Sequence, residues 1–526
     1  MGTSFSMVAK TFQGLEDVLR DELISLGAEN VEMGRRMVSF EGDLELMYKA
    51  NLSLRTALRV LKPIEKFTAA NADELYDIVR EIEWEKYLTV KNTFMVDTTV
   101  NSGEFNHSKF VAYRVKDGIA DHFRDISGER PSISVSNPDI MLNVHIDDDR
   151  VTISLDSSGK PLSMRGYRSE QTEAPINEVL AAGIIMKTGW RGDCDFADPM
   201  CGSGTFLVEA ALIAANINPG IYRDSFAFEK WPDFNKDLFE ELYNDDSAER
   251  EFAFKIYGGD IDAEAVRIAR KNIKSAQVED MIELNCRPMS DWIDNPESGV
   301  MVMNPPYGYR LKPEDITELY RGIGTCLKRN FPGWHAWIIG LNDEDFDNIG
   351  LKPSMKLPLL NGNLECSLRE YILFDGKYDK FRAEGGRVSY HDMDDEQAKA
   401  PRKMRRLTDD EWKKETRQYG SHDKKSGFKS DRKQDRKFEN RGDRKFENKG
   451  NRKFENKGDR KFENKGNRKF ENKGDRKFEN RSDRKPFKRG AVTVKPSGPK
   501  ISADKAHIIN PVHFRSRKQK EEKESE

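Results

Sequence analysis

The chain has 526 residues, of which 37% are hydrophobic and 10% aromatic, enough for two or three domains with cores of their own. Its formal net charge of -3 conceals an asymmetry: residues 431–490 carry 24 Lys and Arg against 12 Asp and Glu, and the remainder carries 64 against 79. No apolar run approaches the ~20 residues of a membrane span, and no signal-peptide core is present. We therefore expect neither membrane insertion nor secretion.

Residues 1–60 have the pattern of a small α+β module with β-α-β order. The expected elements are strands at 7–9 and 31–40 and helices at 15–26 and 44–54. Residues 61–160 repeat the theme. The expected elements there are helices at 73–81 and 109–125, a strand at 93–100, and a hairpin formed by 139–146 and 150–156.

The predicted helix at 109–125 is amphipathic and carries scattered basic residues. They are Lys109, Arg114, Lys116 and Arg124. Such residues are either a solvated helix face or contacts to RNA phosphates, and the sequence leaves both interpretations open.

Residues 165–380 alternate strands with helices, which predicts a doubly wound, mostly parallel α/β sheet. The expected strands are 195–198, 255–259, 282–285, 300–303 and 335–340, and the expected helices are 175–187, 205–216, 263–275 and 314–329. Asn361-Gly362 lies between two further β-type runs, at 355–360 and 364–374, and predicts a closing antiparallel hairpin.

Residues 390–526 have a different character, with an eight-residue period of the type D-R-K-F-E-N-K-G from Asp435 onward. The repeats hold no aliphatic residues, so no core offsets the chain entropy, and we expect a disordered basic tail. The tail is either a solubilising segment or an accessory tether whose Arg-Lys pairs and Phe side chains contact nucleic acid.

The five cysteines, Cys194, Cys201, Cys286, Cys326 and Cys366, are odd in number and form no C-x-x-C. Neither a disulfide framework nor a bound metal is expected. Free thiols in a reducing cytosol predict a cytoplasmic protein.

The stretch D-P-M-C-G-S-G-T, from Asp198 to Thr205, joins a buried strand to a helix through a Gly-rich turn. Gly202 and Gly204 permit tight backbone geometry and close approach of a ligand to the helix N-terminus. No G-K-[ST] follows, which argues against an NTP-binding loop.

A second strand ends at Asp260-Ile261-Asp262. A carboxylate at such a strand tip can accept both hydroxyls of a ribose, and we assign this role to Asp260. We assign Asp262 to the cap of the following helix.

The third element is N-P-P-Y, Asn304 to Tyr307, at the end of a central strand. The Asn304 side-chain oxygen and the Pro305 carbonyl can accept the two hydrogens of an exocyclic amine, which stabilises the charge that develops on nitrogen. Tyr307 offers a stacking face for a flipped base. The three elements together predict methylation of an amino nitrogen on a planar base.

These elements resemble class I S-adenosylmethionine-dependent methyltransferases of the N-P-P-Y type, and further stretches resemble THUMP-domain RNA methyltransferases. The stretches are G-L-E-D-V-L-R-D-E-L (14–23), R-T-A-L-R-V-L (55–61), V-K-D-G-I-A-D (115–121), S-L-D-S-S-G (154–159), R-G-Y-R (165–168), A-P-I-N-E-V-L-A-A (174–182), N-P-G-I-Y-R (218–223) and N-P-P-Y-G-Y-R-L (304–311). Over residues 5–380 the chain is similar to the bacterial 23S rRNA (guanine-N2)-methyltransferase family.

The resemblance implies a ferredoxin-like module at 1–60 and a THUMP module at 61–160 that grip structured RNA, followed by a Rossmann-like catalytic domain at 165–380. It implies S-adenosylmethionine as the cofactor and 23S rRNA, or a large-subunit assembly intermediate, as the partner. Two alternatives stay open: a tRNA guanine-N2 methyltransferase, and a non-catalytic RNA-binding assembly factor.

The resemblance also implies roles for single residues. The implied cofactor-binding residues are Asp198, Met200, Gly202, Gly204, Thr205 and Asp260. The implied catalytic and substrate-binding residues are Asn304, Pro305, Pro306, Tyr307 and Arg310. Lys109, Arg114 and Lys116 are candidate RNA contacts because of their place on the amphipathic helix, and not because of the resemblance. Family members usually contact the adenine through an acidic residue after the third strand. Pro288 stands at that place here, so either Asp291, three residues later, or a backbone group fills the role.

Overall fold

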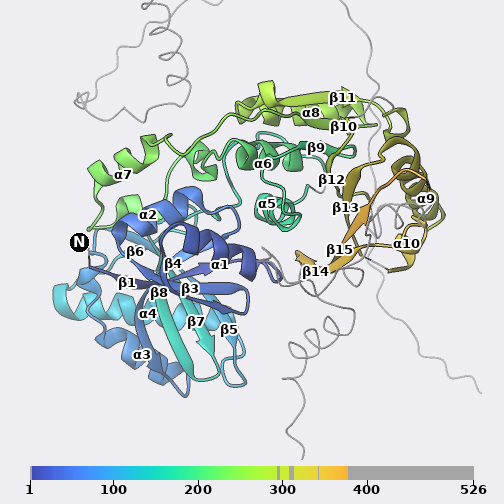
Figure 1. Ribbon diagram of the computed structural model, residues 1–526. Coiled ribbons are helices and arrows are strands. Elements are labelled where there is room, and N and C mark those ends of the chain that lie inside the picture. Colours follow the sequence, from blue (N-terminus) through green and yellow to red (C-terminus); the bar gives the residue numbers. More distant parts are fainter. Residues whose placement is uncertain (1–2, 174, 293–295, 307–312, 342, 377–526) are drawn as a thin grey trace, which may run out of the picture. The chain divides into compact units, whose positions relative to one another are not determined.

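The computed structural model describes residues 3–173, 175–292, 296–306, 313–341 and 343–376. This part of the chain is α/β and is built on two sheets (Figure 1). The predictions of a disordered tail at 390–526, and of roles for Tyr307 and Arg310, concern residues outside the described part.

The N-terminal sheet has eight strands in the order β2-β3-β1-β4-β8-β7-β5-β6. Its strands are β1 (Phe5–Lys10), β2 (Glu29–Gly34), β3 (Met37–Gly42), β4 (Arg59–Thr68), β5 (Thr93–Asn101), β6 (Ser132–Ile133), β7 (Ile140–Asp147) and β8 (Arg150–Asp156). Its helices are α1 (Glu16–Ser25), α2 (Leu44–Ser53), α3 (Ala72–Glu81) and α4 (Ser108–Ser127). The sheet is therefore continuous across both predicted N-terminal modules.

The prediction of a single strand at 31–40 was wrong. The segment forms two antiparallel strands, β2 and β3, joined at Arg35 and Arg36. Arg36 adopts φ 56°, a left-handed conformation that reverses the chain. Apolar residues stand on both sides of the turn, at Val31 and Met33 and again from Met37 to Phe40, and Gly34-Arg35-Arg36 interrupts them. A single strand from 31 to 40 passes over this interruption, which is the local signal of the reversal.

The second sheet has seven strands in the order β11-β10-β9-β12-β13-β15-β14. Its strands are β9 (Asp195–Asp198), β10 (Ile256–Asp260), β11 (Ile282–Cys286), β12 (Gly299–Met303), β13 (Trp334–Gly340), β14 (Met355–Asn361) and β15 (Leu364–Ile372). The first five strands are parallel, and β15 lies antiparallel between β13 and β14. The doubly wound sheet and its hairpin edge are thereby confirmed. Helices α5 (Glu178–Lys187), α6 (Thr205–Ala214), α8 (Ala263–Ser275) and α9 (Pro313–Asn330) connect or flank these strands, together with short α10 (Asp343–Asp347).

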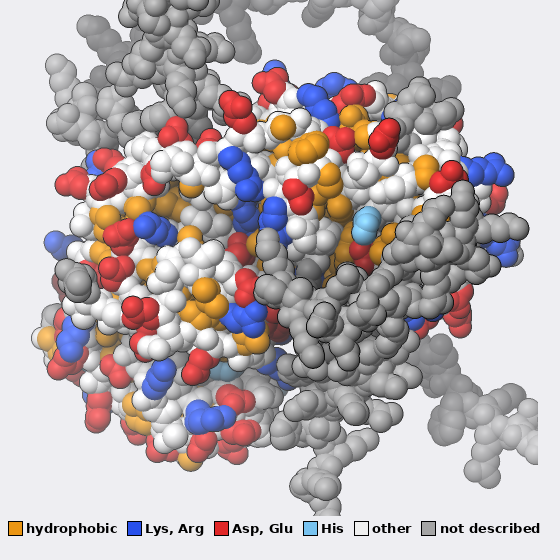
Figure 2. Space-filling view, in the orientation of Figure 1, with side chains coloured by type: hydrophobic (Ala, Val, Ile, Leu, Met, Phe, Trp, Pro, Cys, Tyr) orange, Lys and Arg blue, Asp and Glu red, His pale blue; other side chains and the backbone are white. Residues whose placement is uncertain are grey.

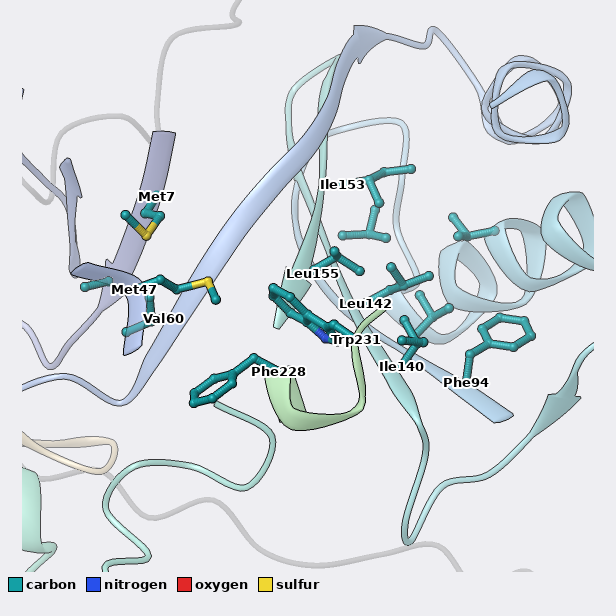
Figure 3. Packing of buried hydrophobic residues seen from close by; sticks show 14 of the residues in the cluster. Met7, Met47, Val60, Phe94, Ile140, Leu142, Ile153, Leu155, Phe228 and Trp231 are labelled. Atoms are coloured by element: carbon teal, nitrogen blue, oxygen red, sulfur yellow. The ribbon is translucent and has the colours of Figure 1, made fainter. Parts of the chain in front are cut away.

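The segment between α6 and β10 carries helix α7 (Lys236–Asn244) and packs into the core of the N-terminal part. Phe228 is fully buried, and its ring stacks on that of Tyr48 with centroids 4.5 Å apart. Figure 3 labels Phe228 and Trp231 together with Val60, and all three belong to the same buried cluster. The Asn235 amide also donates to the Tyr48 hydroxyl over 3.0 Å. The two sheets are thus joined through side chains of this insertion.

No helix within the described ranges is long and apolar enough to cross a membrane. The five cysteines are free thiols. Among the residues that the structure describes, no group of His, Cys, Asp and Glu could hold a metal ion. The face shown in Figure 2 intermixes acidic and basic side chains.

A candidate cofactor and substrate pocket

A pocket of about 420 Å³ lies where the loops after β9, β10 and β12 meet. The direction of strand order reverses between β9 and β12, and open α/β sheets bind their ligands at such a switch point. The lining residues come from six segments: Thr172, Pro175, Ile176; Asp198 to Ser203, Thr205, Phe206; Asp260, Ile261; Pro288 to Ser290; Asn304, Pro306; and Leu319, Gly322, Ile323, Cys326. The structure thus brings all three predicted elements to one cavity.

The Gly-rich turn forms one wall and depends on two left-handed glycines. Gly202 has φ 51° and Gly204 has φ 80°. Residues other than glycine adopt these left-handed backbone conformations only at a cost in free energy. A Cβ on Gly204 would lie 3.1 Å from the Ala269 Cβ, so the glycine also lets α8 approach. Gly204 is the N-cap of α6 and supplies no side-chain cap. The first amides of α6 are therefore available to a polar ligand.

Two carboxylates stand behind this turn. Asp198 is 1% exposed, and its Oδ1 accepts a hydrogen bond from the Met200 amide over 3.1 Å. Burial raises the pKa of Asp198 well above its usual range, and the charge of Asp260 adds to the shift. Asp260 accepts from the amides of Gly202 and Asp262, each over 2.9 Å. Asp262 caps α8 by accepting from the Glu264 amide, as its position predicts.

Asn304 follows β12 and is half-buried. Its side-chain oxygen Oδ1 is fully buried and has no hydrogen-bond partner among the described residues. A buried acceptor without a donor is costly and rare in folded proteins. Because Asn304 and Pro306 both line the pocket, this acceptor is placed to receive a hydrogen-bond donor from a ligand.

The structure does not bring Asp291 into the pocket. Asp291 is exposed, and its carboxylate accepts from the Ser290 hydroxyl over 2.9 Å. The preceding residues Pro288, Met289 and Ser290 line the cavity instead. At this place the wall offers apolar side chains and backbone groups rather than a carboxylate.

Two further residues, the half-buried Arg168 and the buried Asn272, hydrogen-bond to the Gly-rich turn, and the sequence did not indicate either of them. Arg168 donates to the hydroxyls of Ser203 and Thr205 over 3.3 and 2.9 Å, and it pairs with Glu178 over 2.6 Å. Asn272 of α8 is 1% exposed and donates to the Ser203 carbonyl over 3.0 Å. These contacts span 35 and 69 residues of sequence, so no local pattern signals them.

The predicted RNA-contacting residues lie apart from this pocket, on α4. Arg114 pairs with Asp73 over 2.6 Å, and its guanidinium lies over the Tyr76 ring. Lys109 is exposed, and Lys116 lies 5.3 Å from the centre of the Tyr113 ring.

Comparison with known proteins matches three segments of the chain to families. Residues 6–61 match the RlmL ferredoxin-like domain, residues 69–156 the THUMP domain, and residues 165–370 the RMKL-like methyltransferase domain. A proposed RNA methyltransferase of Synechocystis, slr0064, is 38% identical over 373 residues, which are 70% of this chain and 96% of that protein. The ribosomal RNA large subunit methyltransferase K/L of Syntrophotalea carbinolica is 38% identical over 392 residues, 72% of this chain and 55% of that protein. The chain thus spans about half the length of the K/L relatives it matches.

Among solved structures, SMU.472, a proposed methyltransferase in complex with SAH, has a TM-score of 0.65 and 32% identity over 72% of this chain and all of that one. TrmN from Thermus thermophilus, at 17% identity and a TM-score of 0.52 over 70% of this chain and 99% of its own, shares the fold. The fold and the pocket define a class I methyltransferase. The chain belongs to the family of THUMP-containing, RMKL-like methyltransferases.

Proposed function

We propose that this protein transfers a methyl group from S-adenosylmethionine to the exocyclic N2 amine of a guanine in 23S rRNA. The single observation that carries the chemistry is the buried Oδ1 of Asn304, which has no hydrogen-bond partner within the described ranges and lies in a pocket shared with Asp260 and the Gly-rich turn. The names of the K/L relatives support ribosomal RNA of the large subunit as the substrate, and the THUMP match supports an RNA substrate. An RNA substrate of this kind implies a cytoplasmic location.

The polar and apolar groups that line the pocket fit S-adenosylmethionine. Its volume of about 420 Å³ lies in the range of pockets that enclose a nucleoside-sized ligand. Asp260 can accept the ribose hydroxyls, the Gly-rich turn admits the methionine end without side-chain obstruction, and Pro288 and Met289 offer an apolar wall to the adenine. Asp198, Met200 and Thr205 are the further proposed contacts of the cofactor.

The bound cofactor supplies an electrophilic methyl group on a sulfonium. The protein has to activate a poor nucleophile, because the amine lone pair of guanine is delocalised into the ring. Asn304 Oδ1 and the Pro305 carbonyl accept the two amine hydrogens, which favours a tetrahedral nitrogen and stabilises its developing positive charge. A nitrogen–carbon bond forms as the sulfur–carbon bond breaks, and the surplus amine proton leaves to water. Pro306, Tyr307 and Arg310 are proposed to hold the flipped base and its neighbours.

The N-terminal part is proposed to capture structured RNA, with residues 1–60 and 61–160 as its two modules and residues 165–380 as the catalytic domain. Lys109, Arg114 and Lys116 are the proposed phosphate contacts. The ion pair with Asp73 neutralises the charge of Arg114 and weakens its attraction for a phosphate. Lys109, by contrast, is exposed.

The test is nucleoside mass spectrometry of 23S rRNA and tRNA from a strain that lacks the protein, followed by re-methylation with purified protein. We expect N2-methylguanosine to disappear from 23S rRNA and to return on addition of enzyme and cofactor. A loss confined to tRNA would leave the pocket chemistry standing and replace the substrate. If neither RNA pool changes although the protein binds S-adenosylmethionine, the proposed guanine-N2 activity is refuted.

A further inference from the structure

Helix α4 exposes two neighbouring aromatic side chains. Phe110 is 53% exposed and Tyr113 is 59% exposed, whereas most large aromatic residues of folded proteins are largely buried. They are three residues apart on the helix, so their side chains lie next to each other on one face. The opposite face, with Val111 and Val115, is buried in the N-terminal core. The core therefore fixes the orientation of the helix and leaves the aromatic pair facing outward.

Charge is distributed unevenly along the same helix. Residues 108–116 include three basic side chains and no acidic one, whereas residues 117–127 include three Asp and one Arg. In the basic half, the side chain of Arg114 is committed to Asp73. Lys109 and Lys116 form no ion pair with any residue in the described ranges. The aromatic pair is thus flanked by two cations that are available to an anionic partner.

We propose that Phe110 and Tyr113, with Lys109 and Lys116 beside them, form a stacking surface for unpaired nucleotides of the RNA substrate. This inference rests on the proposed function for the identity of the RNA. Bases stack on aromatic rings while lysines neutralise the flanking phosphates. Bases inside an A-form duplex present no free face, so the surface selects loops, bulges or single-stranded ends.

The test compares a Phe110→Ala/Tyr113→Ala variant of the full chain with the wild type, using a short single-stranded RNA and a duplex of the same length. The stacking energy of one base corresponds to about a 5- to 150-fold change in affinity. We expect at least a fivefold loss of affinity for the single strand and an unchanged affinity for the duplex. Wild-type protein should change the fluorescence of a 2-aminopurine in the single strand, and the variant should not.

The matched control is Ile126→Ala, an equally exposed apolar residue (62%) in the last turn of the same helix. It should leave both affinities unchanged. Replacing Lys109 and Lys116 by Gln should weaken the binding of both RNAs. For the single strand, the slope of log affinity against log salt concentration should become less steep by about 0.7 for each phosphate that is no longer neutralised. Thermal unfolding of every variant checks that the surface substitutions leave the fold intact.

Three outcomes would overturn the stacking surface. The first is an equal loss of affinity for single strand and duplex, and the second is no loss of affinity for either. The third is that the wild type is a dimer and the double variant is a monomer. The last would make the face a contact between copies of the protein. These outcomes are independent of the proposed function. If the wild type binds single strands through Phe110 and Tyr113 but methylates no guanine, the proposed function fails and the stacking surface stands.

Discussion

The amide of Gly202 donates to Oδ2 of Asp260 over 2.9 Å, which ties the Gly-rich turn to the tip of β10. A second bond, from the Cys201 amide to the Gly259 carbonyl over 2.9 Å, joins the same two segments. Asp260 is therefore both a proposed ligand of the ribose and a brace for the turn that is proposed to hold the methionine end. The two halves of the proposed cofactor site depend on one carboxylate.

Asp260→Ala should weaken cofactor affinity about 10- to 100-fold, because it removes hydrogen bonds to a charged acceptor and releases the turn. Isothermal titration with S-adenosylhomocysteine measures the effect. Asp262→Ala is the matched control: it should cost about 1 kcal/mol of stability as a lost helix cap and leave affinity nearly unchanged. Unchanged affinity in the Asp260 variant would remove this residue from the site.

Asn304→Ala should lower the rate of methyl transfer by about 100- to 1,000-fold, the typical cost of one preorganised electrostatic contact. Cofactor affinity should stay close to that of the wild type, because the proposed partner of Oδ1 is the target amine. Single-turnover transfer and cofactor titration are measured on the same preparation. A parallel loss of cofactor binding would show that Asn304 supports the cofactor rather than the amine.

Arg168→Met should lower stability by about 3–5 kcal/mol, because it leaves the buried carboxylate of Glu178 unpaired. It should also weaken cofactor affinity, since Ser203 and Thr205 lose their donor. The double variant Arg168→Met/Glu178→Gln separates the two effects. We expect it to regain stability and not affinity; full recovery of affinity would assign Arg168 a purely structural role.

Phe228→Ala should cost about 3–5 kcal/mol in the free energy of unfolding, the usual cost of removing a buried aromatic ring. Chemical denaturation measures it, and Phe254→Ala, at a 42% exposed position, serves as the control with little effect. Because Phe228 packs on Tyr48, proteolysis between the two sheets should also accelerate. A loss below about 1 kcal/mol would mean that the insertion contributes little to joining them.

Because of His145 on β7, the free energy of unfolding should decrease as the pH is lowered into the acidic range. Burial lowers its pKa below the usual 6.5, and the charge of Lys10 adds to the shift. Between the folded and the unfolded pKa the unfolded chain binds more protons, so stability decreases as the pH falls below about 6.5. His145→Gln should flatten the melting temperature between pH 6.5 and the folded pKa, as thermal scans at several pH values would show. An identical slope in both proteins would contradict this role.

The meeting of Asp198, Asp260 and Asn304 could be predicted, because each ends a parallel strand and such ends share one edge of the sheet. The absence of Asp291 from the pocket could not, since a short 3-10 turn at Met289–Asp291 directs its carboxylate to Ser290. The role of Arg168 could not be predicted either, because its partners Ser203 and Thr205 lie 35 and 37 residues away in the sequence. Strand-end residues follow from periodicity, and residues that brace them follow from tertiary packing.

Strand β4 pairs with β1 through Arg59 to Leu61 and with β8 through Leu61 to Thr68. A cut at residue 60 would therefore open two sheet edges at once, each with unpaired backbone groups. The core beneath β4 also takes in Phe228 and Trp231 from the insertion before β10. The unit to exchange in a chimeric protein is therefore discontinuous in sequence. Residues 5–156 have to be transferred together with residues 226–244, because the two segments share one core.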